Sequence, residues 1–318
     1  MIYTHQTNHK NKPKLSIGLP TYNGEDSIQR RLENILSQTF TDFELIISDN
    51  CSTDSTCAIC ERYSTKDERI RLIRQEKNMG WVRNFISVLE EAKGEYFVWA
   101  TDDDLWSSNF LEKNVKILEF NKNVVGSVGR IEQPGVNLYK LDPNDSLIKK
   151  IYKTFRGKFR PFGTSSLSGS YEDRLRMCMK TASYQNIFAV FRTKELQKSI
   201  IPEPVPAWDA AMVLSVLKHG DIHVVDEVLI SYRPGGLSSK TYVIPWRNRD
   251  LRFKELFFPN SGFGFWCANT FGLKFFLKSF DYFIWLVCLD LAAILIKPVR
   301  LIVNRISQEK NDLRSKND

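Results

Sequence analysis

The strongest constraint on the fold is a regular alternation of short apolar segments and amphipathic segments through the first 120 residues. The apolar runs predict strands at Leu15–Leu19, Phe43–Ile47, Ile70–Ile73 and Tyr96–Ala100. The segments that follow them carry apolar residues at helical spacing and predict helices over 27–37, 56–63, 82–92 and 109–120. Strands and helices in this order predict an α/β fold with a mainly parallel, Rossmann-like sheet covered by helices on both faces.

Length and composition exclude several classes of protein. A chain of 318 residues holds about two domains, or one α/β domain with an extension. Its 42% hydrophobic and 26% charged residues are typical of a globular protein and exclude a disordered, collagen-like or coiled-coil chain. No stretch of 18 apolar residues is free of charge, which argues against a polytopic membrane protein. Six cysteines are too few for a disulfide scaffold.

The net charge of +8 is concentrated in two regions. Counting Lys and Arg against Asp and Glu gives +6 for residues 137–180 and +6 for 240–318, but −3 for 1–136 and −1 for 181–239. A nucleic-acid-binding protein more often carries its basic residues on the core fold, so nucleic acid is not expected as a partner. Basic residues on appended segments fit either a membrane-surface protein or ordinary solvated charges.

The amino terminus and the cysteines favour a cytoplasmic protein with reduced thiols. Residues 1–12 are polar and lack the apolar segment of a signal peptide, so cytosolic residence is the default expectation. Cys57 and Cys60 form a CxxC pair, but no second pair and no paired histidines accompany it. This spacing does not favour a zinc site.

Polar clusters follow three of the predicted strands: Pro20-Thr21-Tyr22-Asn23, Asp49-Asn50 and Thr101-Asp102-Asp103-Asp104. In an open α/β sheet, ligands bind beyond the carboxyl ends of the strands, where these clusters would meet. Adjacent carboxylates repel each other unless a cation lies between them, and oxygen-only ligands with substrate phosphates suit Mg²⁺ or Mn²⁺. Alternatively, the acidic triplet caps the next helix, and Asp104 is the expected cap. No P-loop or GxGxxG motif is present.

Two segments resemble a known family in order and spacing. LSIGLPTYNGEDSIQRRLENILSQTFTDFELIISDNCSTDST (15–56) and NMGWVRNFISVLEEAKGEYFVWATDDDLW (78–106) are similar to family 2 glycosyltransferases of the GT-A fold, and the likeness covers roughly residues 14–239. The resemblance implies transfer of a hexose or N-acetylhexosamine from a nucleotide-diphosphate sugar to a hydroxyl acceptor, usually with inversion. Family members build polysaccharides and lipid-linked glycans of the cell envelope.

The resemblance also implies roles for individual residues. Asp49 matches the first Asp of the family's DDGSTD stretch and would accept a hydrogen bond from the imide of the base. In this chain the second Asp and the Gly of that stretch are replaced by Asn50 and Cys51. Asp103 would hold the divalent metal, Mg²⁺ or Mn²⁺, and Asp102 would lie near the ribose. The remaining residues expected to bind the nucleotide sugar are Pro20, Thr21, Tyr22, Asn23, Arg83 and Arg233. Arg233 could equally form a structural salt bridge.

Asp209 is the expected catalytic base. Pro206-Ala207-Trp208-Asp209 precedes AAMVLSVLKHG, an apolar stretch that predicts a helix ending at Gly220. In the family, the base that activates the acceptor hydroxyl is an acidic residue at the head of such a helix. The alternative is that Asp209 is an N-cap without a chemical role.

The expected domains are a flexible N-terminus (1–13), a catalytic domain (14–250) and a C-terminal amphipathic helical tail (251–318). Within the catalytic domain, residues 14–130 would bind the nucleotide sugar and 131–250 the acceptor.

Asp281 and Asp290 interrupt the apolar stretch of the tail, and basic residues flank it, so helices lying on a membrane are predicted rather than a spanning helix. The enzyme would then be cytoplasmic, attached peripherally to the inner face of the cytoplasmic membrane, and would meet a lipid-linked acceptor. The tail could instead form a protein interface, including one between identical subunits.

An alternative to an active enzyme is a non-catalytic protein that binds nucleotide sugars, or a scaffold in a glycan assembly complex. The presence of both Asp103 and Asp209 argues against it.

Overall fold

A computed structural model describes residues 2–3, 12–102, 104–132, 150, 163–205, 207–232 and 261–284. The chain divides into two compact units. The first comprises Met1–Asn137 and Arg160–Val243, and the second comprises Leu138–Phe159 and Ile244–Asp318.

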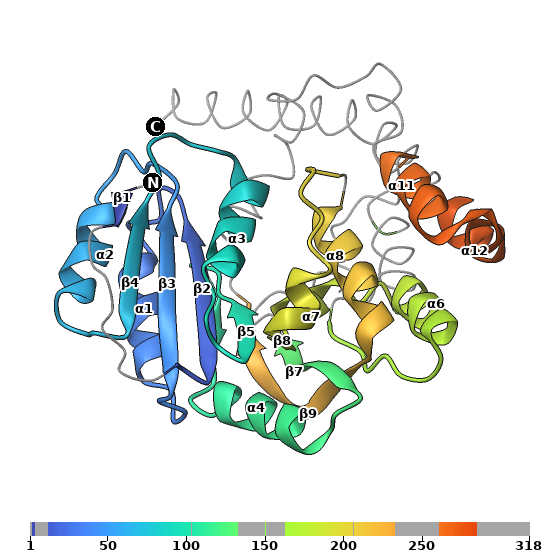
Figure 1. Cartoon of the computed structure of the whole chain (residues 1–318), viewed down its shortest axis with the longest axis horizontal. Helices are drawn as coiled ribbons and strands as arrows, with labels where there is room; N and C mark the ends of the chain where they lie inside the picture. The colour runs from blue at the N-terminus through green and yellow to red at the C-terminus, as the bar shows by residue number, and fades with distance from the viewer. Residues whose placement is uncertain are drawn as a thin grey trace, which may run out of the picture. The chain divides into compact units, whose positions relative to one another are not determined.

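The first unit is built on a nine-stranded sheet with the order β1-β4-β3-β2-β5-β8-β7-β9-β6 in the part of the chain that the structure describes (Figure 1). The strands are Ile2–Tyr3 (β1), Leu15–Thr21 (β2), Phe43–Asp49 (β3), Ile70–Arg74 (β4), Tyr96–Trp99 (β5), Leu105–Trp106 (β6), Val124–Glu132 (β7), Val190–Arg192 (β8) and Asp221–Ser231 (β9). The long pairings β2–β3, β3–β4, β2–β5 and β7–β9 are parallel. Each antiparallel pairing joins only two residue pairs.

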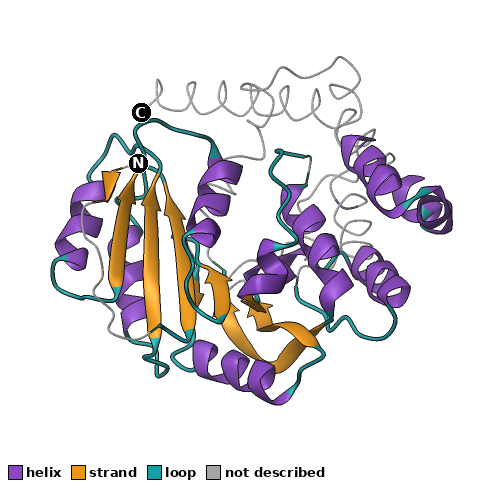
Figure 2. Cartoon of the chain, viewed as in Figure 1, coloured by secondary structure: helices purple, strands orange, loops and turns teal. Residues whose placement is uncertain are grey.

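Helices flank this sheet (Figures 1 and 2). They are Ile28–Leu36 (α1), Thr56–Ser64 (α2), Trp81–Glu90 (α3), Phe110–Phe120 (α4), Tyr171–Thr181 (α6), Thr193–Gln197 (α7) and Trp208–Val216 (α8), with 3₁₀ turns at Tyr184–Phe188 (η1) and Leu217–His219 (η2). α3 packs on β2 and β3, α4 packs on β7, and α1 packs against α2. The prediction of an α/β fold with a mostly parallel sheet is therefore confirmed.

The apolar runs form strands because they are buried. All seven residues of β2 and all seven of β3 are buried, as expected for parallel strands covered on both faces. The four strands and four helices predicted over the first 120 residues are present, with ends shifted by a few residues. The carboxyl ends of β2, β3 and β5 consequently share one edge of the sheet.

Several elements differ from the prediction or were not predicted. β7, β8 and α6 were not foreseen, and β9 extends over eleven residues because it pairs along its length with β7. The prediction that Asp104 caps the following helix is wrong. α4 begins at Phe110 with Asn109 in the N-cap position, whereas Asp104 is buried and accepts a hydrogen bond from Thr101 Oγ1 at 2.8 Å.

The second unit is described only over 261–284, apart from Lys150. Its helices are Ser261–Phe271 (α11) and Leu273–Lys278 (α12), joined at Gly272, whose φ of +85° lies in the left-handed region that glycine favours. Phe263, Cys267 and Phe275 are buried, but other large apolar side chains are exposed: Phe265, Leu273, Leu277, Phe280 and Ile284. Among the helices that the structure describes, none is long and apolar enough to cross a membrane.

Candidate functional site

Two buried polar atoms lie side by side at the carboxyl ends of β2 and β3. Thr21 and Asp49 are register partners in the parallel pairing, and each is 3% exposed. Asp49 Oδ2 accepts a hydrogen bond from the backbone N–H of Ser52 at 3.2 Å. Thr21 Oγ1 and Asp49 Oδ1 have no hydrogen-bond partner among the described residues. Because buried polar atoms are nearly always paired, these two mark a place where a ligand can bind.

The loops that follow β2 and β3 are joined by hydrogen bonds. Asn23 has a φ of +50°; its backbone N–H donates to Ser52 Oγ at 3.0 Å, and its side-chain oxygen accepts from the N–H of Thr53 at 2.8 Å. Asn23 therefore fastens one loop to the other. This contact was not foreseen, since the residue was expected to face the nucleotide.

Asp54 completes the connection between the two loops. Its Oδ2 accepts from the N–H of Glu25 at 3.2 Å, and its Oδ1 accepts from the N–H and the hydroxyl of Thr56 at 3.0 and 2.5 Å. Burial raises the pKa of Asp54, but these hydrogen bonds outweigh it and hold the pKa below its usual value. The carboxylate is thus the form that the folded loops favour.

Asp102 lies against the first of these loops. A Cβ atom added to Gly24 would stand 2.4 Å from Asp102 Oδ2 and 3.2 Å from Thr21 Oγ1. Only a glycine leaves room for the carboxylate at this point. The structure therefore brings Asp102, Thr21 and Asp49 to one edge of the sheet, as predicted from the sequence.

Arg83 and Asn84 occupy different environments on α3. Asn84 is buried: its side-chain nitrogen donates to the carbonyl of Ser48 at 3.1 Å, and its oxygen accepts from the Ser48 hydroxyl at 2.6 Å. Arg83 is partly exposed and forms a double hydrogen bond with Glu90, at 2.9 and 3.0 Å, on the outside of α3. The structure thus brings Asn84 to the strand ends but gives Arg83 a partner elsewhere, and the nucleotide-binding role of Arg83 stays a prediction.

Asp209 lies in the first turn of α8, whose nine residues are all described. It is the one exposed residue of this helix, which is otherwise almost entirely buried. The N-cap position belongs to Ala207, which has a φ of +52° and whose side chain makes no capping hydrogen bond. The alternative that Asp209 is the N-cap is therefore wrong. A carboxylate in a first turn is favoured by the helix dipole.

An aromatic cluster fixes where Asp209 lies. Trp208 is buried, and its indole N–H donates to the carbonyl of Ile201 at 2.9 Å. Its ring contacts Trp99 of β5 and Trp81 and Phe85 of α3, with centroid distances of 6.0, 5.7 and 6.3 Å. Because Trp99 ends β5 just before the segment that carries Asp102, this cluster holds the start of α8 near the carboxyl edge of the sheet.

The surroundings of the two CxxC cysteines, Cys57 and Cys60, keep their thiols protonated. Burial and the charge of Asp49 raise the pKa of Cys57, although Arg74 Nε donates to its sulfur at 2.8 Å. Burial also raises the pKa of Cys60. Thiols held in the protonated form are poor metal ligands and poor nucleophiles.

Three predicted residues lie outside the described part of the chain: the metal ligand Asp103, the diphosphate-binding Arg233 and Pro206 before the catalytic helix. Within the described part, no group of three or more His, Cys, Asp or Glu residues could hold a metal ion. The carboxylate of Asp102 is an oxygen donor at the end of β5. One or two carboxylates completed by substrate phosphates suit Mg²⁺ or Mn²⁺, so the donor chemistry fits such an ion.

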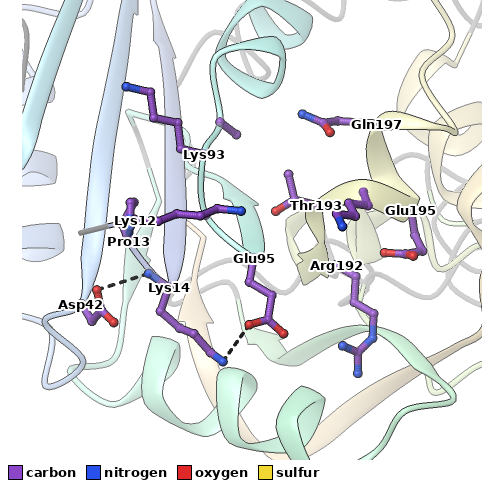
Figure 3. Close-up of a pocket in the computed structure, with 13 residues that line it drawn as sticks. Lys12, Pro13, Lys14, Asp42, Lys93, Glu95, Arg192, Thr193, Glu195 and Gln197 are labelled. Carbon is purple, nitrogen blue, oxygen red and sulfur yellow. Dashed lines mark hydrogen bonds and ion pairs between the residues drawn. The ribbon is translucent and has the colours of Figure 1, made fainter. Parts of the chain in front are cut away.

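A separate hollow of roughly 560 Å³ opens at the amino ends of β2 and β5, the opposite edge of the sheet (Figure 3). Its charges are partly paired: Lys14 Nζ contacts Glu95 at 2.8 Å and Glu119 at 3.2 Å. None of the predicted site residues lines it. It is therefore not the site that the strand ends form.

The sequence reasoning missed the contributions of Asp54, Glu25 and Trp81. Asp54 and Glu25 stand in loops rich in helix-capping residue types, a pattern that gives no sign of bonds between loops. Trp81 directly precedes the predicted helix over 82–92 and was given no role from the sequence; the residue is 52% exposed.

Comparison with known proteins places this geometry in a family. The aligned part of TuaG from Bacillus subtilis, named for teichuronic acid biosynthesis, is 36% identical over 107 residues, which are 34% of this chain and 42% of that protein. Staphylococcus aureus TarS with UDP-GlcNAc superposes over 69% of this chain and 58% of that chain, with a TM-score of 0.52 and 22% identity. The mannosyltransferase PcManGT of Pyrobaculum calidifontis, with GDP-Man and Mn²⁺, covers 76% of this chain and 63% of its own, with a TM-score of 0.50 and 17% identity.

The likenesses to solved structures confirm the GT-A fold. The segment aligned with TuaG covers less than half of that protein. The model of the family described as "Glycosyl transferase family 2" matches residues 16–175, half of the chain. The chain is therefore a member of glycosyl transferase family 2.

Proposed function

We propose that the protein transfers a sugar, with inversion, from a nucleoside-diphosphate sugar to a hydroxyl group of a glycan or lipid-linked acceptor. The observation that carries this proposal is the placement of Thr21 Oγ1 and Asp49 Oδ1, buried and without partners among the described residues, at the ends of adjacent strands. Asp49 Oδ1 is suited to accept the imide N–H of uracil or thymine, or the ring N1–H of guanine. The solved structure of TarS with UDP-GlcNAc supports a nucleotide sugar as the ligand class.

Asp209 is the proposed general base. It would remove the proton from the acceptor hydroxyl while that oxygen bonds to the anomeric carbon of the donor. The bond between the anomeric carbon and the phosphate oxygen breaks, and its electron pair stays on the nucleoside diphosphate. Attack from the face opposite the leaving group inverts the anomeric configuration. The exposed position of Asp209 in the first turn of α8 suits this role.

A divalent ion fits the proposal as the cofactor. Asp103 would hold it, with Asp102 near the ribose, and when bound the ion would stabilise the negative charge on the departing diphosphate. The Mn²⁺ complex of PcManGT supports a metal in a protein of this fold. The hexose or N-acetylhexosamine class of the donor remains part of the proposal.

The proposed function is tested by Asp209→Asn, which keeps the size of the side chain but cannot take up the proton. We expect sugar transfer to fall at least about 100-fold, since general base catalysis contributes about 10²–10⁴-fold. UDP binding, measured by calorimetry with Mn²⁺, should remain within twofold of the wild type.

The matched control is Asp226→Asn on β9, whose side chain is 92% exposed and pairs only at the surface with Arg130. It should retain full transfer. Unchanged transfer by Asp209→Asn would refute the assignment of the base, and absence of binding by UDP, GDP and dTDP to the wild type would refute the function itself.

A further inference from the structure

Trp81 is a large apolar side chain held rigidly at the carboxyl edge of the sheet. It is the first residue of α3, and its side chain is 52% exposed. Its ring makes edge-to-face contacts with Trp208 at 5.7 Å and with Phe85 at 5.9 Å, with interplanar angles of 89° and 85°. The core contacts fix the indole, yet half of it faces outward.

The segment before Trp81 is also anchored. Gly80 N–H donates to Asn78 Oδ1 at 2.9 Å, and Met79 N–H donates to Asn50 Oδ1 at 2.9 Å. Asn50 directly follows β3 and is 3% exposed. The loop that delivers Trp81 is therefore tied to the strand end that carries Asp49, and the indole needs little ordering to bind a ligand.

Two features separate Trp81 from Phe120, another exposed apolar residue of the first unit. Phe120, which is 76% exposed, ends α4, which leads into the start of β7. Since β5 and β7 both pair antiparallel with β8, β7 starts at the same edge as β5, opposite the strand ends that form the site. Trp81 begins its helix and so lies at the edge where ligands bind. It also contacts the residue next to Asp209, which Phe120 does not.

We propose that Trp81 is the platform on which a sugar ring of the acceptor stacks. This inference rests on the proposed function and names a residue that determines acceptor binding. The apolar C–H face of a pyranose packs on an aromatic face, while its hydroxyls stay free for polar contacts. An acceptor hydroxyl must reach Asp209, and Trp208 joins Trp81 to Asp209 through one ring contact and one peptide bond.

The geometry favours the acceptor sugar over the nucleotide as the occupant. The buried, unpaired atoms suited to the base belong to Thr21 and Asp49, at the ends of β2 and β3. Trp81 instead contacts the start of α8, where the proposed base lies.

The test compares Trp81→Leu and Trp81→Tyr in the full-length protein. Leucine keeps an apolar side chain against Trp208 and Phe85 but has no aromatic face, whereas tyrosine keeps one. The probes are UDP and the methyl glycosides of glucose, galactose, mannose and N-acetylglucosamine. Glycoside binding is measured by saturation-transfer NMR in the presence of UDP and Mn²⁺, and transfer kinetics are measured on the glycoside that binds best.

We expect Trp81→Leu to weaken glycoside binding about tenfold and to raise the acceptor KM by a similar factor, with UDP affinity within twofold of the wild type. Trp81→Tyr should keep most of the binding, and the control Phe120→Leu should behave as the wild type. Thermal melting checks that each variant is folded.

Equal glycoside binding by Trp81→Leu and the wild type, or no binding of any glycoside to the wild type, overturns the proposal. So does a parallel loss of UDP and glycoside affinity, which would place Trp81 in the nucleotide site. A wild type that binds a glycoside through Trp81 but transfers no sugar would refute the proposed function, and with it the acceptor role of that sugar, but not the stacking of a sugar on Trp81. Normal transfer with an unchanged acceptor KM in Trp81→Leu would refute this inference and leave the proposed function standing.

Discussion

At the residue scale, the site depends on which way neighbouring side chains point. Arg83 and Asn84 are adjacent in the sequence, but about 100° separates successive side chains on a helix. Asn84 faces the sheet and bonds to Ser48, whereas Arg83 faces outward and pairs with Glu90. The resemblance pointed to Arg83, and only the packing of α3 shows that its neighbour Asn84 reaches the strand ends.

Gly24 offers a sharp test of the position of Asp102. In Gly24→Ala, the new Cβ would stand 2.4 Å from Asp102 Oδ2, so the carboxylate must turn away. Because only the end of a side chain has to move, we expect the melting temperature to change by no more than about 2–3 °C. UDP affinity, measured by calorimetry, should fall about tenfold, since Asp102 is proposed to lie beside the ribose.

The control is the same substitution in an Asp102→Ala background, where the clash is absent. There, Gly24→Ala should have little further effect on UDP affinity. An equal loss in both backgrounds would show that Gly24 acts through its backbone and not through Asp102.

At the element scale, the loops after β2 and β3 form one hydrogen-bonded unit around Asp54. In Asp54→Asn, the amide cannot accept at both positions, and a bond to the N–H of Glu25 or Thr56 is lost. We expect a loss of about 1–2 kcal/mol in the free energy of unfolding at pH 7, measured by urea denaturation. UDP affinity should also fall, because these loops carry the site.

The pH dependence of this effect follows from the lowered pKa of Asp54. A carboxyl whose pKa is lower in the folded state stabilises the protein fully above its unfolded pKa, near 3.8, and loses that contribution as the pH falls through the folded value. The difference between Asp54→Asn and the wild type should therefore shrink between pH 5 and pH 3. A difference that is constant or grows on acidification would contradict the assignment.

The elements of the first 120 residues were predictable because local pattern decides them. β2 and β3 are buried on both faces and read as continuous apolar runs, and helices with one buried face follow them. β8 has only three residues, and β7 carries two glycines; both are strands because of their neighbours in the sheet. Pairing between distant segments cannot be read from periodicity.

Only part of the candidate site was predictable from the sequence. Thr21, Asp49 and Asp102 follow strands, so sheet topology alone brings them together. The position of Asp209 depends on the cluster of Trp208 with Trp99 and Trp81, three residues far apart in the sequence. The exposure of Trp81 is likewise a product of tertiary packing.

At the scale of the whole molecule, the second unit presents apolar surface that a water-soluble helix pair does not need. Phe265 is 71% exposed, Leu273 65% and Leu277 60%, and Lys274 and Lys278 stand among them. Apolar side chains beside lysines are typical of helices that lie on an anionic membrane. We therefore propose a membrane surface as the partner of α11 and α12, and an interface with a second copy of the chain as the alternative.

Vesicle flotation of the full-length protein separates these two partners. We expect the wild type to bind phosphatidylcholine vesicles containing 25% phosphatidylglycerol, and to bind phosphatidylcholine alone more weakly. The double variant Phe265→Ser, Leu277→Ser should bind at least about tenfold more weakly than the wild type, because each inserted side chain contributes about 1.5–3 kcal/mol. Phe120→Ser, an equally exposed change in the first unit, should bind as the wild type. A wild type that ignores both vesicles but sediments as a dimer, and becomes a monomer in the double variant, would assign the apolar surface to subunit contact. The proposed acceptor, if lipid-linked, would then have to reach Asp209 without help from this surface.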